Sequence, residues 1–144
     1  MASNRSKALI DGLNQDLRGE FQAVIMYRLY ASMVQGPFRQ ELRTFFANEI
    51  PEELMHAQVL ADKISAMGGT PAAEAAPVRV VFEAKEMLQA ALQAEIETIG
   101  RYVKRRKQAE DAGEHGLVAQ FDDIIMDETH HRDELQQMLA RWRD

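Results

Sequence analysis

The sequence contains no cysteine, which excludes disulfide bonds, cysteine-ligated zinc and iron–sulfur clusters and fits a reducing compartment. It has no apolar run of about 18 residues that would span a membrane, and residues 1–12 lack the apolar centre of a secretory signal. Positive charge is scarce: 17 Lys and Arg stand against 23 Asp and Glu, and this net charge of −6 disfavours nucleic acid and favours cations as partners. We therefore expect a cytoplasmic protein with no nucleic-acid or membrane partner. At 144 residues it is expected to form a single domain, residues 1–144.

An acidic residue, a glutamate, two further residues and a histidine occur in this order twice in the chain. The first copy is Glu52-Glu53-Leu54-Met55-His56 and the second is Asp127-Glu128-Thr129-His130-His131. In a helix, a spacing of three places a Glu and a His on one face, one turn apart. Each Glu–His pair can therefore bind one metal ion.

The two copies belong to a longer repeat. Their offset is 75 positions, and the same offset relates Glu20 to Glu95 and Tyr27 to Tyr102. It also relates apolar residues: Leu13, Leu17 and Val24 correspond to Leu88, Leu92 and Ile99, and Leu42, Phe46 and Leu60 correspond to Leu117, Phe121 and Leu135. The chain is therefore interpreted as a helical hairpin used twice, with one further glutamate on the first helix of each hairpin.

Apolar residues recur every three or four positions in four segments, and no stretch alternates as a β-strand does. The predicted fold class is all-α, a four-helix bundle with helices at about residues 6–35, 38–67, 82–112 and 114–142. Turn residues lie midway between the paired glutamates, which places those glutamates at one level in the middle of the bundle. The Gly- and Pro-containing link 68–81 is long, so it is expected to cross the bundle and leave the second and third helices parallel.

Four glutamates at one level of a bundle core need a counter-charge. Buried carboxylates lose hydration at several kcal/mol per ion, and two divalent cations would neutralise four of them. Two Glu-x-x-His helices, with one Glu from each of two other helices, form the ligand set of di-iron and di-manganese carboxylate sites. The six candidate metal ligands and catalytic residues are Glu20, Glu53, His56, Glu95, Glu128 and His131. Such ligands suit iron or manganese, and affinity order leaves zinc open; the alternative without metal is a core of protonated carboxyls and hydrogen-bonded histidines.

Further residues are expected to surround this centre. Glu52 and Asp127 should lie near the imidazole of the opposite motif, where a carboxylate accepts the second ring N–H; otherwise they are surface acids. Tyr27, two turns from Glu20, is a candidate catalytic residue that would hydrogen-bond a ligand carboxylate or donate an electron; the alternative is a core tyrosine with a satisfied hydroxyl group. Tyr102 is expected to be a core tyrosine with a satisfied hydroxyl group.

Three other features allow two interpretations each. A second apolar stripe on the first helix, Phe21, Ile25 and Leu29, indicates either a well-covered core or a subunit interface. The basic cluster 104–107 is interpreted as a solvated face. Pro51 lies inside the second helix, and its bend is interpreted as a tolerated irregularity rather than a feature that shapes the site.

Over residues 6–143 these motifs resemble bacterioferritin, within the ferritin-like superfamily. The resemblance rests on Glu20 with Tyr27, on both Glu-x-x-His pairs and on Glu95 in the segment 86–95. It implies a ferroxidase centre that oxidises Fe(II) with dioxygen or hydrogen peroxide, for iron storage or detoxification. The six ligands would hold two iron ions per chain, with Glu53 and Glu128 as the bridging pair.

Three departures from the bacterioferritin pattern modify these expectations. Leu54 occupies the position of the haem-ligating methionine, so no haem is expected. Asn48 stands where the inner-surface iron site has a histidine, although Glu49 and Glu52 remain. The chain ends at Asp144, before the short fifth helix that lines the pores of the large shell. We therefore expect a homo-oligomer, at least a dimer through the first two helices, and leave a large cage open.

Two other functions remain as alternatives. Rubrerythrin-like peroxidases are similar, but they carry a further glutamate three residues after the first one in the third helix, where this chain has Thr98. A small di-metal oxidase or peroxide reductase, with iron or manganese and no storage role, is the alternative function. The third interpretation is not an enzyme: either the metals are purely structural, or the bundle is a binding module.

Overall fold

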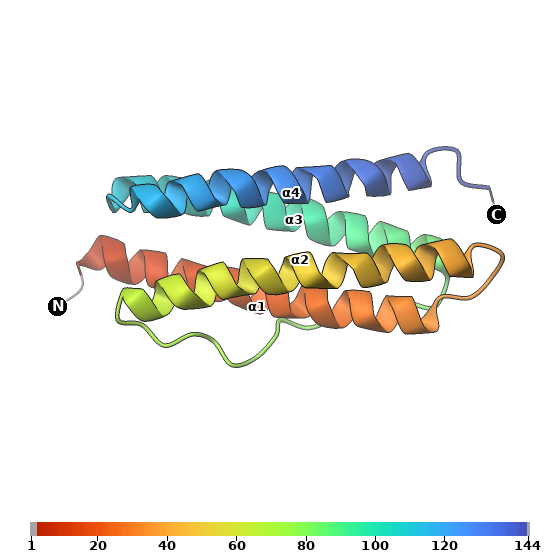
Figure 1. The fold of residues 1–144 in the computed structure, drawn as a ribbon, viewed down its shortest axis with the longest axis horizontal. Coiled ribbons are helices and arrows are strands. Elements are labelled where there is room, and N and C mark those ends of the chain that lie inside the picture. The colour runs from red at the N-terminus through yellow and green to blue at the C-terminus, as the bar shows by residue number, and fades with distance from the viewer. Residues whose placement is uncertain (1–2, 144) are drawn as a thin grey trace.

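The computed structural model describes residues 3–143, which form four helices and, within that range, no strand (Figure 1). The helices are α1 (Asn4–Met33), α2 (Arg39–Ala66), α3 (Ala84–Asp111) and α4 (His115–Leu139). Each helix end lies within three residues of the expected position. Met1, Ala2 and Asp144, which the expected domain includes, lie outside the described residues. The all-α four-helix bundle is confirmed.

The last helix ends earlier than expected. It was expected to reach residue 142, but α4 ends at Leu139 and Arg141 has a φ of 61°. This left-handed backbone is incompatible with a continuing helix. Trp142 therefore leaves the helix direction and packs edge-on against Phe38, with ring centroids 5.4 Å apart. The tryptophan still contributes to the core, but from the segment after the helix.

The link between α2 and α3 crosses the bundle along α1, so that α2 and α3 run parallel as expected (Figure 1). Side chains of α1 hold its backbone. The Asn14 side chain accepts from Ala72 N at 2.8 Å and donates to the carbonyl of Thr70 at 3.1 Å, and the Tyr30 hydroxyl donates to the carbonyl of Arg79 at 2.6 Å. These contacts span most of the length of α1 and satisfy polar groups of a link that has no regular structure of its own.

Two apolar clusters fill the bundle, one toward each end. The first includes Tyr30, Phe46, Leu88 and Leu135, and the second includes Leu13, Leu60, Leu117 and Phe121. The buried glutamates and histidines lie between the two clusters, in the middle of the bundle. This placement excludes water from both ends of the polar layer.

Two expectations concern the outer faces of α1 and α2. In the second stripe of α1, Phe21 and Leu29 are half-buried against the core clusters, whereas Ile25 is 43% exposed. Much of the stripe therefore belongs to the core. Pro51 is exposed, and α2 continues through it without interruption. Among residues 3–143, no helix combines the length and apolarity that crossing a membrane requires.

Candidate metal centre

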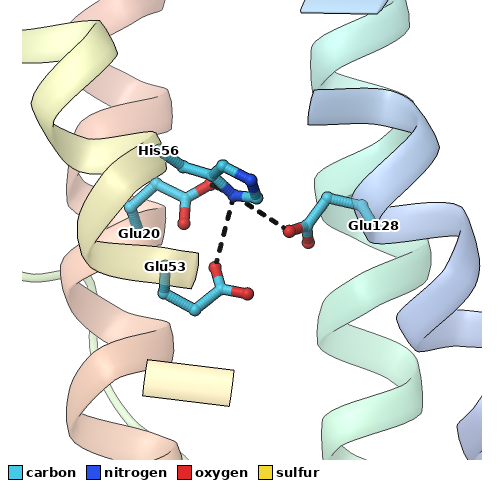
Figure 2. A group of neighbouring side chains, drawn as sticks. All are labelled: Glu20, Glu53, His56 and Glu128. Carbon is cyan, nitrogen blue, oxygen red and sulfur yellow. Dashed lines mark ion pairs between the residues drawn. The ribbon is translucent and has the colours of Figure 1, made fainter. Parts of the chain in front are cut away.

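Two groups of acidic and histidine side chains lie at the middle of the bundle. One comprises Glu20, Glu53, His56 and Glu128 (Figure 2), and the other comprises Glu49, Glu53, Glu95 and His131. Within each group, one potential ligand atom per residue lies within 4.8 Å of all the others. The structure thus brings all six candidate ligands together and adds Glu49 to them. Every one of these seven side chains is buried.

Both imidazoles direct Nδ1 toward the carboxylates. His56 Nδ1 lies 3.1 Å from Glu128 Oε1, 3.7 Å from Glu20 Oε1 and 3.9 Å from Glu53 Oε2. His131 Nδ1 lies 3.6 to 3.7 Å from oxygens of Glu53, Glu95 and Glu128. Glu53 and Glu128 therefore face both histidines, which is the position required of bridging ligands.

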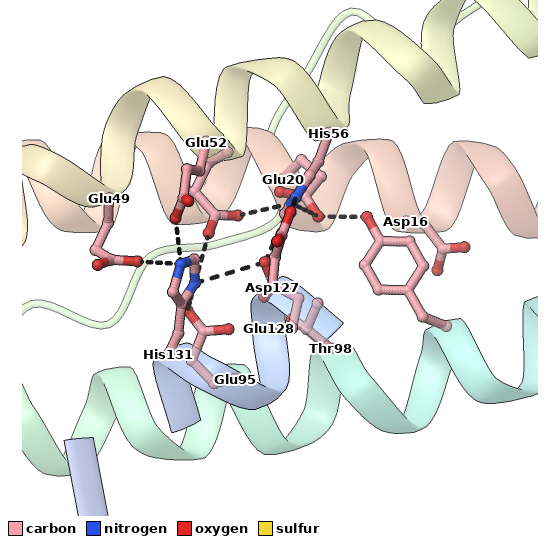
Figure 3. A network of polar contacts seen from close by, with 12 residues as sticks. Asp16, Glu20, Glu49, Glu52, His56, Glu95, Thr98, Asp127, Glu128 and His131 are labelled. Atoms are coloured by element: carbon pink, nitrogen blue, oxygen red, sulfur yellow. Dashed lines mark hydrogen bonds and ion pairs between the residues drawn. The ribbon is translucent and has the colours of Figure 1, made fainter. Parts of the chain in front are cut away.

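The opposite ring nitrogens contact carboxylates that sequence reasoning placed there. His56 Nε2 lies 3.1 Å from Asp127 Oδ2, and His131 Nε2 bonds to Glu52 Oε2 (Figure 3). When Nε2 carries the proton and donates it to the acid, Nδ1 keeps a free lone pair. The expectation for Glu52 and Asp127 is confirmed. Each orients the histidine of the opposite motif.

The interior of the centre contains buried polar atoms without hydrogen-bond partners. They are Glu20 Oε2, Glu49 Oε2, Glu53 Oε1, Glu95 Oε2, Glu128 Oε1 and Nδ1 of both His56 and His131. A buried acceptor that lacks a partner is costly and calls for an explanation. Four carboxylates and two imidazoles, all with free acceptor atoms directed at one another, match the donor set that two divalent cations require. The residues present therefore fit a two-metal centre.

Protonation reflects the crowding of carboxylates. Burial, together with repulsion from Glu20 and the other carboxylates, raises the pKa of Glu53 well above its ordinary value, and burial with repulsion from Glu95 does the same for Glu128. Burial alone would lower the pKa of His56, but the close contacts of its ring with the carboxylates of Glu128 and Glu20 favour the charged form, outweigh burial and raise that pKa to about 11. Protons therefore balance the charge of the centre when no cation does.

His131 and Glu95 show the same balance in the other half of the centre. Burial opposes the charged form of His131, but close contacts with the carboxylates of Glu49 and Glu95 favour that form and raise its pKa to about 11. Burial would raise the pKa of Glu95, but its contacts with Glu128 and His131 and the hydrogen bond from Tyr27 lower it below the usual value.

The two tyrosines cross between the hairpins. The Tyr27 hydroxyl on α1 donates to Glu95 Oε1 on α3 at 2.6 Å, and the Tyr102 hydroxyl on α3 donates to Glu20 Oε1 on α1. Burial raises the pKa of both tyrosines well above the ordinary value, so both remain donors. Tyr102 is a core tyrosine with a satisfied hydroxyl group, as expected, and the acceptor of that hydroxyl group is a candidate ligand, Glu20.

Two contacts were not predicted from the sequence. Glu49 lies one turn before Glu53 on α2, and its Oε2 is 2.9 Å from His131 Nε2. Its position in the apolar seam was the available signal. The other is Arg105, which was expected on a solvated face but is 3% exposed and pairs with Asp16, Nε to Oδ2 at 2.8 Å. Asp16 is one turn before Glu20, which was its only signal.

Comparison with known proteins places these findings in context. The model of the ferritin-like domain family matches residues 10–144. Over 134 residues the chain is 32% identical to a bacterioferritin of Streptomyces coelicolor, covering 91% of this chain and 79% of that protein. It is 28% identical over 129 residues to a bacterial ferritin of Neisseria meningitidis serogroup B, covering 87% of this chain and 84% of that protein.

Solved structures agree with these relatives. A crystal structure described as ferritin-like, diiron-carboxylate proteins from Bacillus anthracis superposes with a TM-score of 0.94 at 46% sequence identity, covering 96% of this chain and 99% of that one. A Dps protein from Bacillus brevis has a TM-score of 0.91 at 20% identity, covering 96% of this chain and 99% of that one. The second likeness concerns the fold alone.

Proposed function

The chain belongs to the ferritin-like domain family, and from this premise we propose that it is a ferroxidase that binds two Fe(II) ions per chain at the mid-bundle centre and oxidises them with dioxygen or hydrogen peroxide. The observation that carries the proposal is the set of buried, partnerless acceptor atoms on Glu20, Glu53, Glu95, Glu128, His56 and His131. The bacterioferritin and bacterial ferritin relatives support iron as the metal.

The proposed ligands divide into three roles. Glu20 with His56 would hold one iron ion, Glu95 with His131 would hold the other, and Glu53 and Glu128 would bridge them. This division is supported by the approach of Glu53 and Glu128 to both imidazoles. When bound, the two Fe(II) ions supply the two electrons that reduce one peroxide to water or one dioxygen to peroxide.

The residues around the ligands keep the centre in position. Tyr27 holds one oxygen of Glu95 by a hydrogen bond, so the other oxygen is left to face the cations; Tyr102 does the same for Glu20. Asp127 and Glu52 keep the Nε2 proton of each histidine in place. The apolar clusters at both ends exclude water from the carboxylates, which strengthens their attraction to a cation.

A ferroxidase that stores no iron is the second candidate. It is supported by the 46% identity to the ferritin-like, diiron-carboxylate proteins from Bacillus anthracis, whose name specifies a di-iron centre. Both candidates use the same ligands, so they differ only in the fate of the iron once it is oxidised. Stepwise aerobic addition of Fe(II) to metal-free protein separates them: saturation near two irons per chain indicates a non-storing oxidase, and soluble uptake far beyond that indicates storage.

The test of the site itself compares two glutamates of α3. Glu95 faces the centre, whereas Glu97 is exposed and accepts a hydrogen bond from Gln93. Glu95→Gln should abolish rapid Fe(II) oxidation, as should Glu53→Ala and His131→Ala, while Glu97→Gln should oxidise Fe(II) at the wild-type rate. Helix content by circular dichroism should be unchanged in all of them. Wild-type rates in the three ligand variants would overturn the proposal.

The assembly is proposed to be a homo-oligomer, at least a dimer through the outer faces of α1 and α2. Large apolar side chains are exposed there: Ile25, Leu54 and Met55 are 43, 50 and 69% exposed. Leu54 also offers no sulfur to a haem, so the dimer is proposed to form without haem. Leu54→Lys should shift the mass measured by light scattering toward the monomer, and an unchanged mass would exclude this face.

A further inference from the structure

The two halves of the centre are related by the 75-residue repeat, but their surroundings are not equivalent. Adding 75 to Glu49 gives Ile124, and adding 75 to Asp16 gives Ala91. Subtracting 75 from Arg105 gives Tyr30. The two halves therefore differ in charge just outside an otherwise symmetric ligand set.

The half built on Glu95 and His131 has one carboxylate more than the other half. Glu49 is 8% exposed, and its Oε2 lies 2.9 Å from His131 Nε2. That nitrogen has only one proton, which is directed to Glu52, so Glu49 Oε2 is left without a hydrogen-bond partner. At the corresponding place beside His56 the chain has the apolar Ile124, and Asp127 alone faces Nε2.

The half built on Glu20 and His56 lies next to two arginines. Asp16, one turn before Glu20 on α1, pairs with Arg105 at 2.8 Å and lies 3.6 Å from Arg101 (Figure 3 shows Asp16 beside the centre). Two guanidinium groups against one carboxylate leave one positive charge in excess. At the corresponding place in the other half, Ala91 and Tyr30 are buried and uncharged, and the Tyr30 hydroxyl bonds to the link.

The sequence of α1 is adapted to this arrangement. A Cβ at Gly12 would overlap the guanidinium of Arg105, and a Cβ at Gly19 would overlap that of Arg101. The two glycines therefore allow both arginine side chains to lie against the helix backbone. The positive charge beside Glu20 is consequently built into the packing of α1 against α3.

We propose that the two metal positions bind divalent cations unequally and that the position formed by Glu95 and His131 fills first. The carboxylate of Glu49 attracts a cation to that position, while the excess positive charge of Arg105 and Arg101 opposes a cation near Glu20. Both effects favour filling the position of Glu95 and His131 first. The inference rests on the proposed two-metal centre and adds the order in which its positions fill.

The test uses Co(II), whose visible absorption reports its coordination, and requires no oxidation. Two matched variants remove the same ligand from opposite halves: His56→Ala leaves the Glu95 position intact and His131→Ala leaves the Glu20 position intact. His56→Ala should bind its first Co(II) on the order of tenfold more tightly than His131→Ala. Equal affinities, or the reverse order, would overturn the inference.

A second pair of variants changes only the surroundings. Glu49→Gln should weaken the binding of the first Co(II) several-fold in the His56→Ala background and leave it nearly unchanged in the His131→Ala background. Arg101→Met introduces the residue that the repeat has at Met26 and removes the positive charge in excess beside Glu20, so it should strengthen Co(II) binding in the His131→Ala background. Circular dichroism and thermal melting check that each variant is folded.

The outcomes separate this inference from the proposed function. If the wild-type protein binds no Co(II), both are wrong. If it binds two Co(II) ions and the two histidine variants have equal affinities, the two-metal centre stands and the filling order is wrong. If Glu49→Gln changes the Co(II) affinities of both histidine variants equally, Glu49 does not distinguish the two halves, and its role in the filling order is wrong.

Discussion

Tyr27 and Glu95, 68 positions apart in the sequence, are joined by a 2.6 Å hydrogen bond across the middle of the bundle. The repeat supplies its counterpart, in which Tyr102 donates to Glu20. Each hairpin therefore contributes a tyrosine that orients a carboxylate of the other hairpin. The two bonds connect α1 to α3 at the level of the centre and restrict how those carboxylates can turn.

Removing one of these hydroxyl groups tests that connection. Tyr27→Phe deprives Glu95 of its donor in a buried setting, so the free energy of unfolding should fall by about 1–3 kcal/mol. Urea denaturation followed by circular dichroism measures it. Tyr102→Phe should show a loss of similar size because Tyr102 donates the corresponding bond to the buried Glu20. A change within experimental error in both variants would show that the bonds contribute nothing.

A bound cation should stabilise the fold strongly. Because the candidate ligands come from all four helices, a metal should bind only the folded state, and such a metal raises the stability of the fold by about 2.7 kcal/mol at a concentration a hundred times its Kd. Adding Zn(II) to metal-free protein should therefore raise Tm, and a chelator should reverse the change. Glu97→Gln, on the exposed face of α3, should respond like the wild type, whereas a melting temperature indifferent to both zinc and chelator would contradict the centre.

Replacing Glu53 by glutamine should have opposite effects with and without metal. The pKa of Glu53 is raised in the folded state, so the ionised carboxylate opposes folding. The stability that the protonated carboxyl group contributes is therefore lost as the pH rises above 4.5, the ordinary pKa of the group. Glu53→Gln removes that cost, and at pH 7 the metal-free variant should be more stable than wild type by on the order of 1–3 kcal/mol. With Zn(II) the order should reverse. Denaturation curves of the wild type and Glu53→Gln, each with and without Zn(II), measure these differences in stability. A metal-free variant less stable than the metal-free wild type would contradict the prediction.

Metal binding should depend steeply on pH. The pKa values of His56 and His131 are raised to about 11 in the metal-free protein, so both imidazoles are protonated at pH 7 and each must lose a proton for Nδ1 to bind a cation. Apparent affinity should rise with pH between 6 and 8, by about tenfold per unit for each proton released. Calorimetric titration in buffers of different ionisation enthalpy counts those protons. Binding that releases no protons would show that neither histidine loses a proton when a cation binds.

Two glycine-to-alanine changes test the packing of the buried ion pair. Gly12→Ala introduces a methyl group where the Arg105 guanidinium lies, and it should lower the free energy of unfolding by about 1–3 kcal/mol. Gly100→Ala, inside α3 with nothing within 4 Å of its Cβ, should instead raise it by about 0.5–1 kcal/mol through helix propensity. Similar effects of both changes would mean that Arg105 does not depend on the space at Gly12.

The helices and the six candidate ligands could be predicted because their signals are local. Apolar spacing of three and four defines a helix face, and Glu53 with His56 must share that face wherever the helix lies. The repeat then placed Glu20 and Glu95 at the same level. Glu52 and Asp127 were predicted for the same reason, since each precedes a ligand by one residue.

Other features depended on which residues meet across the bundle. In the sequence, Arg105 cannot be told from the other basic residues of the cluster 104–107. It is buried because Asp16 and the space at Gly12, both on α1, lie opposite it in the fold, and a charged group is buried only with a partner. Glu49 occupies a seam position, but only the approach of His131 on α4 makes it part of the centre. Tyr102 found its acceptor on another helix. Periodicity specifies the face that a side chain occupies, whereas its partner, and hence its charge and hydrogen bonding, is set by a helix that is distant in the chain.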